Sequence, residues 1–191
     1  MQTQLTDQSA MLLYLLFHYE LEGESCTPFS LNKLAYLLQE AGEPFNLSFT
    51  KIELGLYSAE LMNMLKPLNG TYLNNLETDN AKAFEEMHLN YEKWEEVKSH
   101  VETKLNQKQR FRLHSVTQLI KGFESSFSIE LLSTVDYLMK HETAQNPDEL
   151  MTALSSWSNR KKEIFNRREV EITYNHLKEH RNLGSASLQP A

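Results

Sequence analysis

The sequence predicts a mainly α-helical fold, a single compact domain of about seven helices with a minor β element near residues 47–54. Apolar residues recur at spacings of three and four along most of the chain, which is typical of helices that bury one face. Several of these stretches begin with a capping residue or end at a glycine. No proline-rich or glycine-serine linker divides the 191 residues, so one domain is favoured over two.

The first half of the chain predicts helices at residues 10–21, at residues 31–41 and from about residue 58 onward. Gly23 can end the first helix in the left-handed conformation. Ser30 can cap the second helix, and Gly42 can stop it just before Pro44. The mixed stretch between the second and third helices fits a strand or an extended loop, and it is where we expect the β element.

The second half predicts helices whose apolar residues fall at 94–105, 116–123, 131–139, 150–157 and 170–177. Two of these helices have well-marked starts. Asn146, Pro147 and Glu149 combine a capping asparagine with proline at the first helical position and glutamate at the third. Asn166 and Glu169 repeat the capping pattern before the last helix.

Composition points to a reducing compartment. Cys26 is the single cysteine, so no internal disulfide can form. No stretch approaches the roughly 18 consecutive apolar residues of a membrane-spanning helix. We therefore expect a cytoplasmic chain that does not span a membrane, with a helical domain at residues 1–181 and a flexible tail at residues 182–191.

Motifs that carry chemistry are scarce. His176, Glu179 and His180 match the H-x-x-E-H pattern of some zinc peptidases. In that class the third ligand follows well downstream, whereas only 11 residues follow His180, so we expect no metal site and place both histidines at the exposed end of the last helix. No glycine-rich loop that could wrap a phosphate occurs. The sequence therefore predicts no cofactor, no catalytic residues and no enzyme.

Charge is distributed unevenly along the chain. Residues 1–103 contain 16 acidic and 6 basic side chains, whereas residues 104–191 contain 10 acidic and 13 basic ones. A formal net charge of −7 and a pI of about 5.5 would repel polyphosphate, so direct nucleic-acid binding is not expected. The acidic half favours a protein partner with a basic groove, because complementary fields speed encounter.

A family resemblance begins in the second predicted helix. Residues 33–44 read KLAYLLQEAGEP, which resembles the K-x-x-Y-x-x-Q-E-A-G-E-P segment in the C-terminal domain of DarG antitoxins. Gly55 and Tyr57 follow where those proteins read Y-G-P-Y, but Leu54 and Leu56 stand in place of the family's tyrosine and proline. That turn is therefore expected to differ in its shape or in its contact surface.

Later segments carry the same resemblance. Residues 122–125 read GFES and residues 130–135 read ELLSTV, which is similar to the family's G-F-E-[ST] and E-L-L-[AS]-T-V stretches. Trp157, the pair RK at residues 160–161 and Phe165 are similar to its closing W-x-x-R-K-x-x-x-F. The matches follow in order from about residue 33 to residue 177, and the QEAGEP segment is the most specific of them.

The resemblance implies the toxin-binding domain of DarG antitoxins, without the macrodomain that removes ADP-ribose from DNA. The partner that it implies is a DarT-type toxin, an enzyme that transfers ADP-ribose from NAD to bases of single-stranded DNA. Inhibition would come from occupancy, with this domain covering the DNA site of the toxin. Such a site should present a basic track with stacking surfaces.

The interface that we expect is partial DNA mimicry, with carboxylates in the place of phosphates and aromatic side chains in the place of bases. The residues chosen for it are Glu40, Glu43, Glu53, Tyr57 and Glu60, because they cluster around the most distinctive motif. The alternative is that residues 39–44 close a helix and pack a turn, while other residues bind the partner.

Two further functions stay open. The fold could serve as a helical antitoxin or a chaperone-like adaptor for a different toxin or effector. It could also be an enzyme without a recognisable motif. A pocket that holds paired titratable groups would distinguish an enzyme from a binding module.

Overall fold

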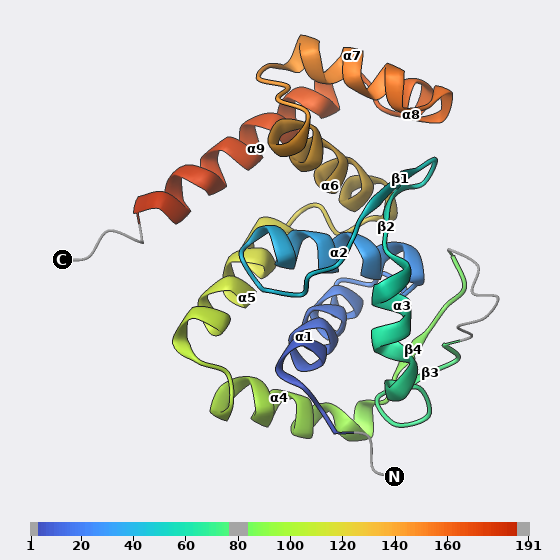
Figure 1. The fold of residues 1–191 in the computed structure, drawn as a ribbon, viewed down its shortest axis with the longest axis vertical. Coiled ribbons are helices and arrows are strands. Elements are labelled where there is room, and N and C mark those ends of the chain that lie inside the picture. The colour runs from blue at the N-terminus through green and yellow to red at the C-terminus, as the bar shows by residue number, and fades with distance from the viewer. Residues whose placement is uncertain (1–3, 77–83, 187–191) are drawn as a thin grey trace.

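The computed structural model describes residues 4–76 and 84–186, with side chains described as far as His180. This part of the chain is mainly α-helical, which confirms the predicted fold class (Figure 1). The helices are α1 (Asp7–Leu21), α2 (Pro28–Glu40), α3 (Ala59–Leu65), α4 (Trp94–Thr103), α5 (Gln107–Leu119), α6 (Ser126–His141), α7 (Pro147–Trp157), α8 (Asn159–Ile164) and α9 (Arg167–Ala186). Strand β1 (Thr50–Ile52) pairs with β2 (Gly55–Tyr57), and β3 (Leu73–Asn74) pairs with β4 (His88–Leu89). Within the described residues, no helix combines the length and the apolar character that crossing a membrane requires.

Helix α2 lies at the centre of the domain. It packs against α1, α5 and α6 and against strand β2 of the hairpin. Every residue of α2 from Pro28 to Leu38 is buried, so the helix has neighbours on all sides over this length. Helix α4 lies at one end of the domain, α7 and α8 lie at the other, and α5 runs along the side from α4 toward α2 (Figure 1). The chain is therefore organised around one helix whose neighbours come from both halves of the sequence.

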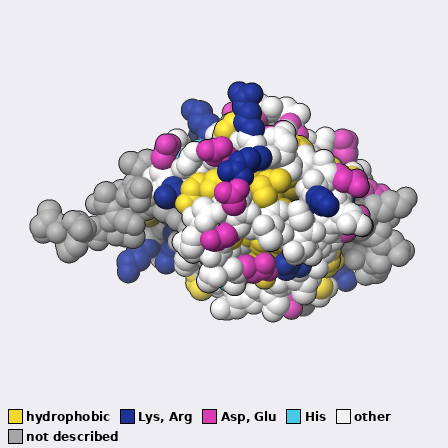
Figure 2. Space-filling model, turned by 90° about the horizontal axis from the view of Figure 1, so that it is seen from above, with side chains coloured by type: hydrophobic (Ala, Val, Ile, Leu, Met, Phe, Trp, Pro, Cys, Tyr) yellow, Lys and Arg dark blue, Asp and Glu magenta, His cyan; other side chains and the backbone are white. Residues whose placement is uncertain are grey.

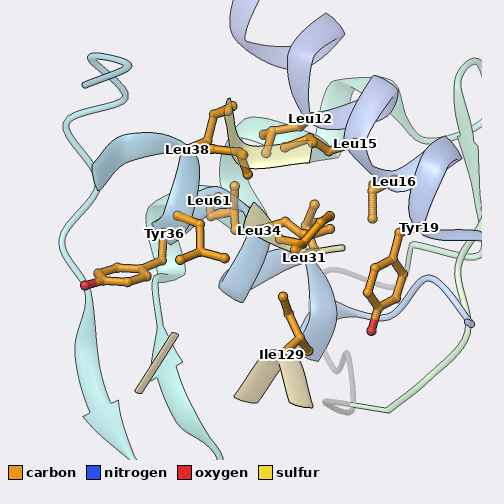
Figure 3. Packing of buried hydrophobic residues seen from close by; sticks show 14 of the residues in the cluster. Leu12, Leu15, Leu16, Tyr19, Leu31, Leu34, Tyr36, Leu38, Leu61 and Ile129 are labelled. Carbon is orange, nitrogen blue, oxygen red and sulfur yellow. The ribbon is translucent and has the colours of Figure 1, made fainter. Parts of the chain in front are cut away.

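The hydrophobic core joins α2 to the helices around it. Leu31, Leu34 and Leu38 of α2 are each 0% exposed. Figure 3 shows them among leucines of α1, together with Leu61 of α3 and Ile129 of α6. Burying one such side chain contributes roughly 1.5–3 kcal/mol. The regular apolar spacing of the sequence thus has its physical cause in this shared core.

A capping box sets the start of α2. Thr27 is the N-cap residue, three positions before the predicted cap, Ser30. The Thr27 hydroxyl accepts the Ser30 amide at 3.1 Å, and the Ser30 hydroxyl accepts the Thr27 amide at 3.0 Å. Pro28 occupies the first turn, where the missing amide costs nothing. The predicted end at Gly42 is confirmed by its φ of 98°.

The expected β element is a hairpin. Lys51 lies opposite Leu56 and Ile52 lies opposite Gly55 in the antiparallel register of β1 and β2. Gly55 adopts a φ of 105°, a conformation that side chains with a Cβ rarely adopt. The second pair, β3 with β4, contains two residues per strand and is not predicted from the sequence.

Helices α5, α8 and α9 differ most from the prediction. Helix α5 begins well before residue 116, because Asn106 and Gln109 form a capping box at its start. Helix α8 is not predicted at all, since charged residues leave too few apolar positions to show a period. Helix α9 continues to Ala186 and thus overlaps the expected tail at residues 182–191, of which residues 187–191 lie outside the described part of the chain.

Candidate functional site

Two of the five predicted binding residues lie where α2 ends. Glu40 is the last residue of α2, and its carboxylate lies 3.2 Å from Lys140 Nζ and 3.2 Å from His141 Nε2 on α6. The side chain of Glu43 is only 2% exposed, and its Oε2 accepts a hydrogen bond from Arg112 of α5 at 3.0 Å. Both carboxylates are therefore committed to ion pairs within the chain.

The other three predicted residues lie on the hairpin and at the start of α3. Glu53 is exposed in the turn between β1 and β2, and Tyr57 is 36% exposed at the end of β2. Glu60 is also exposed, and a hydrogen bond from the Ser58 hydroxyl at 2.8 Å lowers the pKa of its carboxyl. The structure thus divides the five residues between the end of α2 and the region of the hairpin.

A pocket of about 250 Å³ opens between α2, α5, α6 and α9. Apolar side chains form most of its wall, while its charged groups come from α2, α5 and α6, and α9 adds a histidine. It is lined by Leu37, Glu40, Ala41, Phe111, Arg112, Ser115, Val116, Leu119, Asp136, Lys140, Leu177 and His180. Of the five predicted binding residues, Glu40 alone is in this lining.

Two carboxylates share one lysine on the wall of the pocket. Lys140 Nζ lies 3.1 Å from Asp136 Oδ2 and 3.2 Å from Glu40 Oε2. The Tyr36 hydroxyl donates a hydrogen bond of 2.9 Å to the same oxygen of Asp136. The side chain of Asp136 is 4% exposed, whereas that of Glu40 is 18% exposed. The pair therefore combines a fixed, buried carboxylate with a more accessible one.

The histidines of the H-x-x-E-H motif belong to the same region. His176 Nε2 donates to the Leu119 carbonyl at 2.7 Å, and the His176 ring packs against Phe123. His180 lines the pocket, and burial lowers its pKa, with the neighbouring His176 adding to the effect. The expectation that both lie at an exposed helix end is wrong, because both side chains are partly buried. Among the described residues, no three His, Cys, Asp or Glu side chains are arranged to hold a metal ion.

A second charged cluster is buried below the hairpin. Glu130 of α6 accepts two hydrogen bonds from Arg160, at 2.5 and 3.0 Å, and one from Lys161 at 2.7 Å. Lys33 of α2 lies beside them and is 2% exposed. Burial lowers the pKa of Lys33 to about 7, and the positive charges of Lys161 and Arg160 lower it further, against the attraction of Glu130.

Sequence reasoning missed both charged groups. Asp136 and Lys140 are four residues apart on α6, a spacing that signals an ion pair on a helix but gives no sign of a pocket. The segments that carry the family resemblance include three residues of the buried cluster, Lys33, Glu130 and Lys161. The resemblance is therefore the one signal in the sequence that points to this cluster. The face around α7 and α8 carries charges of both signs among hydrophobic side chains (Figure 2).

A pocket with paired titratable groups is the feature that would distinguish an enzyme from a binding module, and this pocket has such a pair. Glu40 and Asp136 are paired titratable groups, and two carboxylates in a partly apolar pocket can orient hydroxyl groups or accept a proton from water. Phe111 is 39% exposed and adds an aromatic surface to the lining. The arrangement is suited to a small polar ring held between apolar walls.

Comparisons with known proteins point to enzymes that act on modified DNA. No protein-family model matches this sequence. A DNA ADP-ribosyl glycohydrolase of Thermus aquaticus is 30% identical over 169 residues, which are 83% of this chain and 43% of the relative. Proteins of the same name from Mycobacterium bovis and Mycobacterium tuberculosis are each 23% identical over 150 residues, which are 77% of this chain and 43% of each relative. The chain thus spans less than half the length of these curated relatives.

These relatives contradict several expectations drawn from the sequence. Their name describes an enzyme, a glycohydrolase, and it names DNA, whereas we expected no enzyme and no contact with nucleic acid. The name equally contradicts a toxin-binding domain of DarG antitoxins, the inhibition of a DarT-type toxin by DNA mimicry, and the related adaptor function. Of the functions left open, the enzyme is the one that the similarity favours.

Proposed function

We propose that this chain acts in the removal of ADP-ribosyl groups from DNA, as the helical part of a DNA ADP-ribosyl glycohydrolase. The similarity to the Thermus aquaticus relative carries the proposal, because it extends over 83% of this chain. Since the match covers 43% of that relative, the proposal concerns what this domain contributes to the reaction. We assign that contribution to the pocket between α2, α5, α6 and α9.

The lining of the pocket supports the binding of part of an ADP-ribosyl group. Carboxylates such as Glu40 and Asp136 are the acceptors that ribose hydroxyls commonly use. Arg112 and Lys140 are the kinds of cation that pair with phosphate oxygens. The ring of Phe111 is available to stack against a base. Each part of a nucleotide therefore has a matching group in the lining.

The size of the pocket limits what it can hold. Sites for small molecules usually enclose about 300–1,000 Å³, and this pocket has about 250 Å³. It therefore accommodates one nucleoside-sized part of the ADP-ribosyl group, and the remainder extends beyond its mouth. That division suits a substrate whose other end is a DNA strand.

Hydrolysis of a glycosidic bond requires an attacking water and a group that takes its proton. The oxygen of water bonds to the anomeric carbon as the bond to the base breaks, and a carboxylate receives the proton that the water loses. The electron pair of the broken bond stays on the base nitrogen, which takes up a proton from solvent. Asp136 is the more firmly positioned of the two carboxylates, since Tyr36 and Lys140 both hold its Oδ2. Glu40 faces Lys140 from α2 and would orient the sugar.

Other expectations become part of this proposal. A cytoplasmic location is consistent with a DNA substrate. One domain at residues 1–181 is consistent with a single module of a larger enzyme. Of the residues predicted to bind a partner, Glu40 has a role at the pocket. Glu53, Tyr57 and Glu60 are exposed and keep a predicted role in contacts outside it, whereas Glu43 is buried in its ion pair with Arg112.

The test uses a single-stranded oligonucleotide with one ADP-ribosylated base. Release of ADP-ribose is followed by chromatography, and binding is followed by fluorescence anisotropy against the unmodified oligonucleotide. Asp136→Asn should abolish release or weaken binding of the modified strand at least tenfold, which is about 1.4 kcal/mol. Asp148→Asn is the matched control, because its side chain is 77% exposed on α7. The proposal is supported if the unaltered chain and Asp148→Asn prefer the modified strand or release ADP-ribose, while Asp136→Asn does neither. It is overturned if the unaltered chain binds both strands equally and releases no ADP-ribose.

A further inference from the structure

The hairpin of β1 and β2 rests on a buried amine. Lys33 Nζ donates a hydrogen bond of 3.2 Å to the carbonyl of Leu56 on β2 and lies 4.1 Å from the centroid of the Phe29 ring. A Cβ added to Gly55 would lie 3.2 Å from Lys33 Cε, so the strand approaches this side chain closely. Because Lys33 is 2% exposed, water does not stabilise its charge in this position.

The charges around Lys33 do not balance when it is protonated. Facing it are Glu130 from α6 and Arg160 and Lys161 from α8, and Lys161 is itself 0% exposed. Glu53, in the turn of the hairpin, adds its negative charge near Arg160. Two carboxylates thus meet three cations. The cluster becomes balanced when Lys33 is neutral, and a neutral amine can still donate to the Leu56 carbonyl.

A second attachment ties the hairpin to α7. The indole Nε1 of Trp157 donates to the carbonyl of Ile52 at 2.9 Å. Lys51 lies 4.4 Å from the centroid of the Trp157 ring and forms an ion pair of 2.5 Å with Glu142. These contacts are partly exposed, so the hairpin is anchored on β2 by a buried lysine and on β1 by weaker surface contacts.

We propose that Lys33 is a proton-operated latch for the β1–β2 hairpin. With Lys33 neutral, the hairpin stays closed on α2 and α8. Proton uptake adds an uncompensated charge beneath β2, and opening of the hairpin relieves it by letting water reach the amine. The opening also moves the exposed Glu53 and Tyr57, which lie on the hairpin.

The sign and size of the effect follow from proton linkage. The amine has an ordinary pKa of 10.5 when hydrated and one of about 7 when the hairpin is closed. Between these two values, the open form binds one proton more than the closed form. The closed form is therefore favoured up to tenfold more for each pH unit above about 7, and it shows no further change below that pH.

Hydrogen exchange of the hairpin amides tests the latch. Protection factors for Ile52 and Gly55, the pair that closes the hairpin, corrected for the intrinsic rate at each pH, should rise up to tenfold per pH unit between about pH 7 and pH 9. Lys33→Met fills the same space without a titratable group and should remove this rise. Lys162→Met is the control, since Lys162 is an exposed lysine of the same α8. It should leave the rise unchanged.

A direct titration keeps the proposal testable even if Lys33→Met fails to fold. The Cε resonance of Lys33 in the unaltered chain should titrate with a midpoint near 7. A midpoint near the ordinary value overturns the latch. Protection that does not vary with pH, or that varies equally in Lys33→Met, overturns it as well.

Discussion

Glu43 and Arg112 form a partly buried ion pair in the segment that connects α2 to the β1–β2 hairpin. The two atoms lie 3.0 Å apart, and the side chain of Glu43 is 2% exposed. A Cβ on the adjacent Gly42 would come within 3.4 Å of Arg112 Nε, so this turn and α5 fit closely together. The QEAGEP segment therefore has a structural task, which is to join the end of α2 to α5.

Glu43→Gln should destabilise the fold through this pair. The substitution keeps the shape but leaves the guanidinium without its charged partner, and a hydrogen bond to a charged group contributes about 1.5–3 kcal/mol. We expect the lower part of that range, because the side chain of Arg112 is 26% exposed and water can replace part of the interaction. Urea unfolding gives the free energy directly. Glu102→Gln, at an exposed position of α4, should change it by less than about 0.5 kcal/mol.

Gly55→Ala should destabilise the hairpin more than Gly70→Ala. Both glycines have a positive φ, 105° and 79°, so both substitutions carry backbone strain of about 1 kcal/mol or more. Only at Gly55 would the new Cβ also press on Lys33 Cε, at 3.2 Å, whereas Gly70 faces open space. The difference between the two unfolding free energies therefore measures the contact with Lys33. Equal losses would mean that the lysine moves aside freely.

Stability should rise with pH just above neutrality because of Lys33. Its pKa is about 7 in the folded chain and 10.5 without burial, so the unfolded chain binds one proton more between these values. The free energy of unfolding should then increase by about 1.4 kcal/mol per pH unit from about pH 7 to pH 8.5. Burial lowers the pKa of Lys161 as well, with the same sign.

The difference between the unaltered chain and Lys33→Met isolates the contribution of Lys33. Thermal unfolding at three pH values in this window should give a slope for the unaltered chain and a smaller slope for the variant. The window ends there because burial raises the pKa of the Cys26 thiol, so the unfolded state gains stability once free thiols ionise. Identical slopes would show that Lys33 keeps its proton.

Much of the fold could be predicted because capping residues and apolar spacing mark a helix within its own stretch of sequence. The capping asparagine at Asn146 and the proline after it mark the start of α7 where the structure has it. A buried helix such as α2 also shows its apolar period even though it is covered on all sides. These signals lie within a few residues of one another, so one sequence is enough to read them.

The candidate site could not be predicted, because it depends on contacts between distant segments. Arg160 and Lys161 read as solvated cations near a helix end, yet Lys161 is 0% exposed. Its burial follows from Glu130, which is 31 residues away along the chain. Likewise, Tyr36 meets Asp136 across 100 residues. A partner at such a separation leaves no local pattern in a single sequence.

Phe111→Ala should separate binding from stability. The ring is 39% exposed on the pocket wall, so its loss should change the free energy of unfolding by less than about 1 kcal/mol. Stacking of one base on an aromatic ring contributes about 1–3 kcal/mol, so affinity for the ADP-ribosylated oligonucleotide should fall about 5-fold to 150-fold. Ile172→Ala, at a position 53% exposed on α9 and outside the pocket lining, is the control. Equal affinity for both variants would remove Phe111 from the site.

Glu130 is the carboxylate on which the buried cluster depends, and a double-mutant cycle should reveal this. Glu130→Gln leaves Lys161, which is 0% exposed, without a negative charge beside it, with only a neutral amide oxygen and the Thr134 hydroxyl at 3.4 Å as acceptors in this cluster. Removing one member of a buried pair costs about 3–5 kcal/mol, because the other charge stays in a dry environment. Urea unfolding of Glu130→Gln should show a loss of that size.

Removing the lysine as well should restore part of this stability. In Glu130→Gln with Lys161→Met no unpaired amine remains, and the methionine fills the space between Trp157 and Phe165, whose rings lie 5.1 and 5.3 Å from the amine. The two single losses should therefore exceed the loss in the double variant by about 1–3 kcal/mol. If the losses in unfolding free energy of the two single variants simply added up in the double variant, the prediction would be wrong. Water would then solvate Lys161 in Glu130→Gln, and the cluster would be open to solvent.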